Sequence, residues 1–353
     1  MNKIYQKLAD ELDKIPNGFP KTKSGVELKI LAKLFTIEEA KLASSLNLEF
    51  QTIKTIAGNN NADESEVKSS LIGMVKKGLI EMKREAGKGF VFSLIPFVVG
   101  IYERQNAQID KEFAKLFEAY CNEGFYKVMT VNPSVHRVIP IEKSIPVNID
   151  VMPYQKASTY LDNAKSWGVL NCICRVQKRL IGQGCKHSIE NCLVFSENPN
   201  FFSRVKDIRE ITKNEALEIL VEAEKEGLVH STNNAQNDIN YICNCCTCSC
   251  GVLRGLAKHG SLNAIASSNF YAVVDEDLCT GCGVCLDRCQ FKALQIIDGT
   301  CKVNLTYCFG CGLCVTSCSS GALSLQQKNS EELTPPPLND KEWRKKREAS
   351  RKN

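Results

Sequence analysis

The chain has 353 residues, of which 19 are cysteines, and a formal net charge of +5. Its length allows two or three domains, each with a core of its own. Residues 341–353 carry seven basic and two acidic side chains and so account for the whole net charge, which leaves the rest close to neutral and excludes a general polyanion binder.

The first predicted segment, residues 1–25, is an amphipathic helix with Leu8 and Leu12 on its apolar face. It lacks the apolar stretch of a secretory signal. The longest apolar stretch, residues 90–102, is too short to span a bilayer and contains Pro96. We therefore expect a cytoplasmic protein of a low-oxygen cell, without a membrane span, whose thiols ligate metals or clusters.

Residues 26–100 are predicted to form a winged-helix-like domain. Thr36 and Glu39 have the spacing of a capping box at a helix start. Residues 64–77 show an apolar stripe at helical spacing after a capping aspartate. Residues 79–94 read as two strands around a glycine-containing turn, which would be the wing.

This domain is typical of either DNA binding or protein docking. DNA binding would use the basic side chains of its last helix and wing, namely Lys68, Lys76, Lys77, Lys83, Arg84 and Lys88. The same helix also carries Asp63, Glu64 and Glu66, so it lacks a uniformly basic face. We therefore expect a docking or structural role, with nucleic acid an unlikely partner.

Residues 101–165 are expected to be a connector, with a helix at 102–120 followed by proline-rich extended chain. A further helix is predicted at 215–226. Cys121 and Cys301 are isolated from the cysteine-rich runs, and each is expected to be a buried structural thiol.

Residues 166–260 form a predicted α/β region rich in cysteine. Its nine thiols are Cys172, Cys174, Cys185, Cys192, Cys243, Cys245, Cys246, Cys248 and Cys250. Adjacent thiols such as Cys245 and Cys246 cannot both reach one ion comfortably, so more than one centre or some unused thiols are expected. The alternatives are one or two further iron–sulfur clusters, structural zinc, or a dithiol pair. His187 and His230 are near enough to be ligands but are left out, because a lone histidine is more often an ordinary polar residue.

Two cysteine runs with one spacing, Cys-x2-Cys-x2-Cys-x3-Cys, occupy residues 279–289 and 308–318. Such a duplicated run binds two [4Fe–4S] clusters, with the fourth cysteine of each run completing the other cluster. Cluster I is therefore predicted to use Cys279, Cys282, Cys285 and Cys318, and cluster II to use Cys308, Cys311, Cys314 and Cys289. Residues 328–353 are polar and are expected to form a disordered basic tail.

Residues 270–327 resemble the bacterial two-cluster ferredoxins, which carry proline after each fourth cysteine where this chain has Gln290 and Ser319. The whole layout from residue 26 to 327 is similar to a family of 4Fe–4S dicluster ferredoxin-like proteins of anaerobes. The similarity rests on 97–102, on the spacing from Cys172 to Cys192, and on 242–254. Relatives often have a further cysteine at the place of Ser249. The resemblance implies electron transfer more than any particular reaction.

The sequence thus predicts an α+β multidomain iron–sulfur protein. Neither a dinucleotide fingerprint nor a Walker A run is present, so one-electron transfer to a redox partner protein is the expected function. It would be an electron-transfer protein or a subunit of an oxidoreductase more readily than a stand-alone enzyme, and no catalytic residue is predicted. The alternatives are a redox-sensing DNA-binding regulator and an oxidoreductase acting at the middle cysteines. The oligomeric state is open.

Overall fold

The computed structural model describes residues 3–147, 149, 151–205 and 207–352, which divide into two compact units. The first unit is built from the residues up to Val128 together with residues 180–183 and the chain end from Arg351. The second is built from residues 129–179 and 184–350. In the part of the chain that the structure describes, no helix is both long and apolar enough to cross a membrane.

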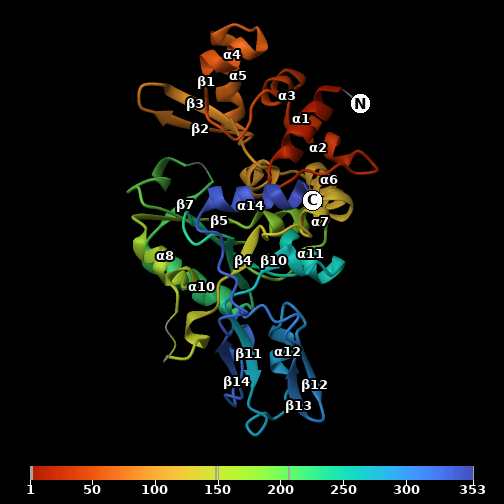
Figure 1. Ribbon diagram of the computed structural model, residues 1–353, viewed down its shortest axis with the longest axis vertical. Coiled ribbons are helices and arrows are strands. Elements are labelled where there is room, and N and C mark those ends of the chain that lie inside the picture. The colour runs from red at the N-terminus through yellow and green to blue at the C-terminus, as the bar shows by residue number, and fades with distance from the viewer. Residues whose placement is uncertain (1–2, 148, 150, 206, 353) are drawn as a thin grey trace. The chain divides into compact units, whose positions relative to one another are not determined.

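The first unit combines a helical bundle with a small sheet of strand order β1-β3-β2 (Figure 1). Its elements are α1 (Lys3–Lys14), α2 (Val26–Leu34), α3 (Ile37–Ala43), β1 (Gln51–Thr52), α4 (Ile53–Asn60), α5 (Glu64–Lys76), β2 (Ile80–Glu85), β3 (Gly89–Leu94), α6 (Lys111–Tyr120) and α7 (Tyr126–Val128). The predicted capping box is confirmed, since Thr36 and Glu39 each bond the other's backbone N–H. The predicted hairpin is confirmed as β2 and β3.

The helix predicted at 102–120 is wrong over its first half. Residues 103–105 form one turn of 3-10 helix and residues 106–110 form turns and irregular chain. Helix α6 begins only at Lys111, where the Asp110 side chain accepts a hydrogen bond from the Phe113 N–H at 2.7 Å. Tyr102, where the predicted helix would begin, instead stacks on Phe117 of α6, with ring centroids 3.6 Å apart. This segment therefore folds back onto α6 instead of extending it.

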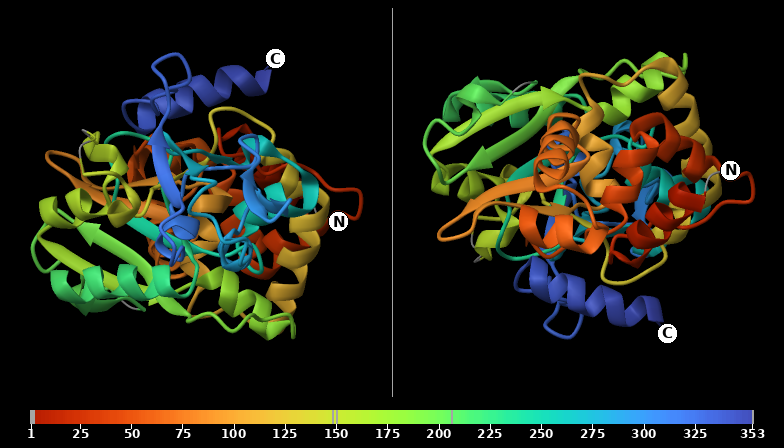
Figure 2. Two further views of the ribbon diagram at one scale, coloured as in Figure 1. Left: turned by 90° about the horizontal axis from the view of Figure 1, so that it is seen from below. Right: turned by 90° about the horizontal axis from the view of Figure 1, so that it is seen from above.

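The second unit contains a seven-stranded sheet of order β10-β4-β8-β9-β6-β5-β7, antiparallel except for the pair β10 and β4. Its elements are β4 (His136–Val138), α8 (Ala157–Asn163), β5 (Ser166–Asn171), α9 (Ile173–Leu180), β6 (Glu190–Ser196), β7 (Arg209–Ile211), α10 (Lys213–Lys225), β8 (Val229–Asn233), β9 (Tyr241–Cys245), α11 (Gly251–His259) and β10 (Ile265–Ala266). Helices α8 and α10 pack on β5 and β6 over a shared apolar core (Figures 1 and 2). The helix predicted at 215–226 is α10, which a capping box of Thr212 and Glu215 begins slightly earlier.

The expected connector at 101–165 is wrong as a separate segment. Its first part belongs to the first unit and its second part to the sheet of the second. Strand β4 pairs with β8, about a hundred positions later, His136 facing Asn233. A strand of three residues has no periodicity of its own, so only this distant partner defines it.

The C-terminal part of the second unit holds both cysteine runs. Two antiparallel pairs, β11 with β14 and β12 with β13, enclose a core that includes Phe270, Leu325 and several cysteines. The elements are β11 (Phe270–Val274), α12 (Val284–Arg288), β12 (Leu294–Ile297), β13 (Thr300–Val303), α13 (Leu313–Thr316) and β14 (Leu323–Gln327).

The expected disordered tail is wrong over its last part, where α14 (Asp340–Lys352) forms. Trp343 and Arg347 are buried on this helix. The Trp343 Nε1–H donates to the Ser134 carbonyl at 2.9 Å, and Arg347 donates to the carbonyls of Val131 and Pro133, both at 2.6 Å. The composition predicted disorder because this segment is highly charged. Trp343 and Arg347, one helical turn apart, nevertheless bind the helix to the backbone of residues 131–134.

We expect Trp343→Ala to lower the free energy of unfolding by about 3 kcal/mol, because it removes a buried indole and its hydrogen bond. The matched control is Lys345→Ala on the exposed side of the same helix, which should change stability by less than about 0.5 kcal/mol. Urea unfolding of both variants measures the difference. Equal stabilities would show that the helix is not docked in solution.

Candidate iron–sulfur and metal sites

Each C-terminal cysteine run folds as a loop that enters a short helix. The third cysteines, Cys285 and Cys314, lie in α12 and α13, and both are buried. Gly281 and Gly310 occupy equivalent places in the two loops, with φ of 64° and 65°. A Cβ on Gly281 would meet the Gly299 carbonyl oxygen at 2.2 Å, and one on Gly310 would meet the Phe270 carbonyl oxygen at 2.1 Å. These positions therefore require glycine.

Backbone N–H groups point at the thiols of both runs. The Cys301 N–H donates to Cys279 Sγ, the Ala293 N–H to Cys289 Sγ, and the Ala272 N–H to Cys308 Sγ, each at 3.3 Å. Such hydrogen bonds stabilise charge on a ligating sulfur and tune the cluster it binds.

A cavity lies at the centre of the second run. Its lining includes Cys289, Cys308, Cys311 and Cys314. The structure thus brings the fourth cysteine of the first run into the group formed by the second run. The fourth cysteine of the second run, Cys318, lies near Cys285 of the first run, since its charge contributes to raising the pKa of the Cys285 thiol. The structure therefore places Cys289 beside the thiols of the second run and Cys318 near Cys285 of the first.

The thiols of the second run fit a cationic partner. Burial, together with the charges of neighbouring thiols, raises the pKa of Cys311 to about 12 and the pKa of Cys314 well above its usual value. Thiolates at these positions need a compensating positive charge, and iron supplies it. The donor set therefore fits an iron–sulfur cluster.

Cys121 and Cys301 are both buried, as predicted. Cys301 Sγ lies 3.7 Å from Cys285 Sγ in the core of the C-terminal segment.

The nine middle cysteines separate into two groups. The larger, which we call the six-thiol group, takes thiols from the residue after β5, from α9, β6 and β9, and from the residue before α11. Each thiol interacts with two others, so that the six form a closed ring. In order around the ring they are Cys172, Cys174, Cys250, Cys245, Cys243 and Cys192. Hydrogen bonds from Cys174 and Cys192 lower the pKa of Cys172 well below its usual value, and those from Cys243 and Cys250 do the same for Cys245.

Arg175 is the buried cation beside this ring, with 1% of its surface exposed. Its hydrogen bonds go to the neutral oxygens of Ser188, Asn191 and Asn244 at 2.5–3.1 Å. Burial lowers the pKa of Arg175, but the nearby thiols, led by Cys172, raise it above its usual value. A buried guanidinium needs a counter-charge, and the thiolates of this region provide it.

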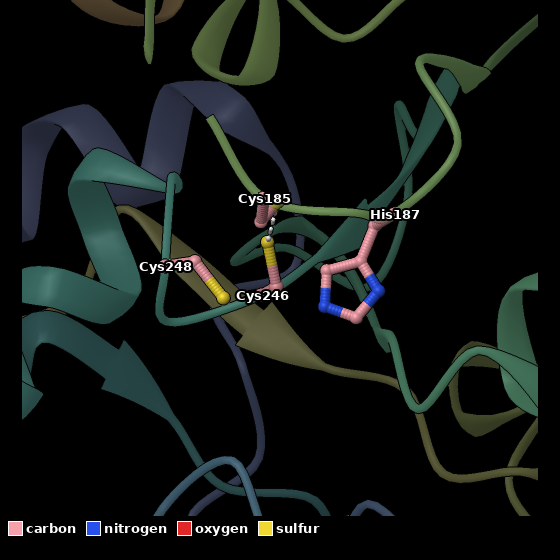
Figure 3. Close-up of side chains that lie close together, drawn as sticks. All are labelled: Cys185, His187, Cys246 and Cys248. Carbon is pink, nitrogen blue, oxygen red and sulfur yellow. Dashed lines mark hydrogen bonds between the residues drawn. The ribbon is translucent and has the colours of Figure 1, made fainter. Parts of the chain in front are cut away.

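The smaller group consists of Cys185, His187, Cys246 and Cys248, whose ligand atoms all lie within 4.8 Å of one another (Figure 3). The structure therefore makes His187, which the sequence analysis left out, a candidate ligand, and its spacing of two residues from Cys185 is the signal in the sequence that points to it. His230 lies elsewhere: it is buried, and its Nδ1 is 2.6 Å from Asn244 Oδ1. Burial lowers the pKa of His230 and favours the neutral ring.

Gln290, which stands where the two-cluster ferredoxins have proline, joins the two cysteine-rich parts of this unit. Its Oε1 accepts hydrogen bonds from the Thr247 N–H and hydroxyl, both at 2.9 Å, and its Nε2 donates to the Gly227 carbonyl at 3.0 Å. Thr247 lies between Cys246 and Cys248. A proline could make none of these bonds, so the departure from the ferredoxin pattern has a structural reason.

A family model for the 4Fe–4S binding domain matches residues 272–295, which contain the first cysteine run. No curated protein matches the chain, and no solved structure matches it. The chain is therefore an iron–sulfur protein with at least one [4Fe–4S] cluster.

Proposed function

We propose that the protein carries single electrons through two [4Fe–4S] clusters and a further metal centre in its middle region. Cluster I is bound by Cys279, Cys282, Cys285 and Cys318, and cluster II by Cys308, Cys311, Cys314 and Cys289. The observation that carries the proposal is the cavity lined by Cys289 together with the three thiols of the second run. Such clusters accept and release one electron at a time, and no hydride-handling motif accompanies them.

The six-thiol group is the third redox centre of this proposal. Six thiols exceed the four ligands of a tetrahedral ion, and soft thiolates in this number suit iron–sulfur assembly. Arg175 supports an anionic centre here, because it is buried beside the ring with neutral hydrogen-bond partners. The middle region therefore extends the electron path instead of serving as a regulator's switch.

Cluster II faces this centre and cluster I faces the redox partner. Gln290 hydrogen-bonds the loop of Thr247 and directly follows Cys289, a cluster II ligand. On the cluster I side, Cys282 is exposed and is flanked by Leu278 and Val284, which are 50% and 48% exposed. An apolar rim around an exposed ligand suits brief docking of another redox protein.

The first unit serves as a docking module with a winged-helix-like core, in our proposal. Several of the lysines considered for DNA binding are neutralised locally: Lys77 pairs with Glu39 at 2.8 Å, and Lys88 and Lys83 pair with Glu85 at 2.7 and 3.8 Å. These ion pairs reduce the positive charge with which the domain could attract a phosphate backbone. A reducing compartment of a low-oxygen cell is the setting in which free thiolates and clusters both persist.

A count of iron and acid-labile sulfide per chain tests the proposal. Two cubic clusters supply about eight irons and eight sulfides, and iron at the six-thiol group raises the count to about twelve or more. We expect the higher count in protein purified without oxygen. About eight irons would remove the third redox centre, and fewer than about six after reconstitution would remove the two-cluster assignment.

A further inference from the structure

The group of Cys185, His187, Cys246 and Cys248 has the dimensions of a mononuclear metal site. Cys185 Sγ and Cys246 Sγ lie 3.9 Å apart. Sulfurs bound at 2.3 Å around a tetrahedral zinc ion are separated by about 3.8 Å. The thiolates of a cubic cluster bind different iron atoms and must stand further apart. The spacing of this pair therefore fits two ligands of one ion.

The imidazole of His187 has the orientation of a metal ligand. Its Nδ1 lies 3.6 Å from the Glu226 carboxylate, and the other ring nitrogen faces the sulfurs (Figure 3). Glu226 is itself fixed, because its carboxylate accepts a hydrogen bond from the Ser188 N–H at 2.8 Å. A carboxylate behind a histidine ring sets the tautomer and increases the basicity of the ligating nitrogen.

This group is separate from the six-thiol group. Cys245 belongs to the ring, and its neighbour Cys246 belongs to the smaller group, since consecutive side chains at the end of β9 point to opposite faces. Ser249 is 2% exposed, and its hydroxyl lies 3.5 Å from Cys185 Sγ, where it can donate to a thiolate. Thus each group has its own ligands and its own supporting contacts.

We propose that Cys185, His187, Cys246 and Cys248 bind one structural zinc ion as a Cys3His site, with Glu226 positioning His187. Four protein ligands close the coordination sphere, so the ion ties the loop of residues 184–191 to the turn at 246–249 and takes no part in redox chemistry. By fixing the end of β9, it also holds Cys243 and Cys245 in place within the ring. This inference concerns residues outside the proposed electron path and stands whether or not the six-thiol group holds iron.

The test is zinc and iron content of the full-length protein, purified without oxygen, measured by mass spectrometry after gel filtration in EDTA. The wild type and the control Cys121→Ser, which changes a buried thiol in the first unit, should each retain about one zinc per chain. Cys248→Ser and His187→Ala should lose at least about 80% of the zinc while keeping the iron content of the wild type. Glu226→Gln should retain zinc but bind it about 10- to 100-fold more weakly.

Cobalt gives an independent readout. Protein produced with Co²⁺ should show the intense visible bands of a tetrahedral cobalt–thiolate site, and His187→Ala should shift or abolish them. The proposal is overturned if wild type retains less than about 0.2 zinc per chain in EDTA, or if Cys248→Ser and His187→Ala lose iron in place of zinc. Loss of the two-cluster iron with zinc retained would contradict the proposed electron transfer and leave the zinc site standing.

Discussion

Replacing Arg175 with methionine is expected to empty the six-thiol group of metal and to lower the free energy of unfolding by about 3–5 kcal/mol, because it leaves a buried negative centre without its counter-charge. Three backbone or side-chain oxygens also lose their donor, among them the carbonyl of Asn244, which accepts two of the guanidinium hydrogen bonds. Iron and sulfide analysis should show that the variant keeps the roughly eight irons of the two cubic clusters and loses the additional iron of the six-thiol group.

Two matched variants separate charge from geometry. Arg175→Lys keeps the charge but not the planar fork and should fall between wild type and Arg175→Met. Arg209→Met removes an exposed arginine that pairs with Glu190 on the same sheet and should cost less than about 1 kcal/mol. Full iron content and stability in Arg175→Met would show that the six-thiol group is not an anionic centre.

Replacing Cys282 or Cys311 with serine is expected to remove one [4Fe–4S] cluster each, about four irons per chain, and to leave its neighbour. Cys282 belongs to the first cysteine run and is exposed, and Cys311 lines the cavity of the second run. Electron paramagnetic resonance of each reduced variant should show one signal without the spin coupling of a two-cluster protein.

Cys301→Ala is the control, since this buried thiol lies within 4 Å of Cys285 but is outside both ligand sets. It should keep both signals and their coupling. Loss of both clusters in Cys282→Ser and in Cys311→Ser alike would argue against the crossed ligand sets. Loss of a cluster in Cys301→Ala would make that thiol a ligand.

The sequence by itself determined the features whose partners are close along the chain. The cysteine runs have a spacing that one short loop and helix can satisfy. The capping box at Thr36 and the hairpin of β2 and β3 are likewise made by residues a few positions apart. Local chemistry is enough in each case, and these predictions needed no tertiary contact.

Only the tertiary structure decided what depends on distant pairing. The nine middle thiols come from two stretches of chain that are far apart in the sequence, so their division into two groups follows from the pairing of β5, β6 and β9 and not from spacing. His187 became a candidate ligand because the same folding brings Cys185 to Cys246, 61 positions away. Helix α14 docks because Trp343 meets the Ser134 carbonyl, 209 positions away. Such contacts form between segments that are far apart in the sequence, and forming them closes long loops. The composition and periodicity of one segment do not indicate which distant segment it will contact.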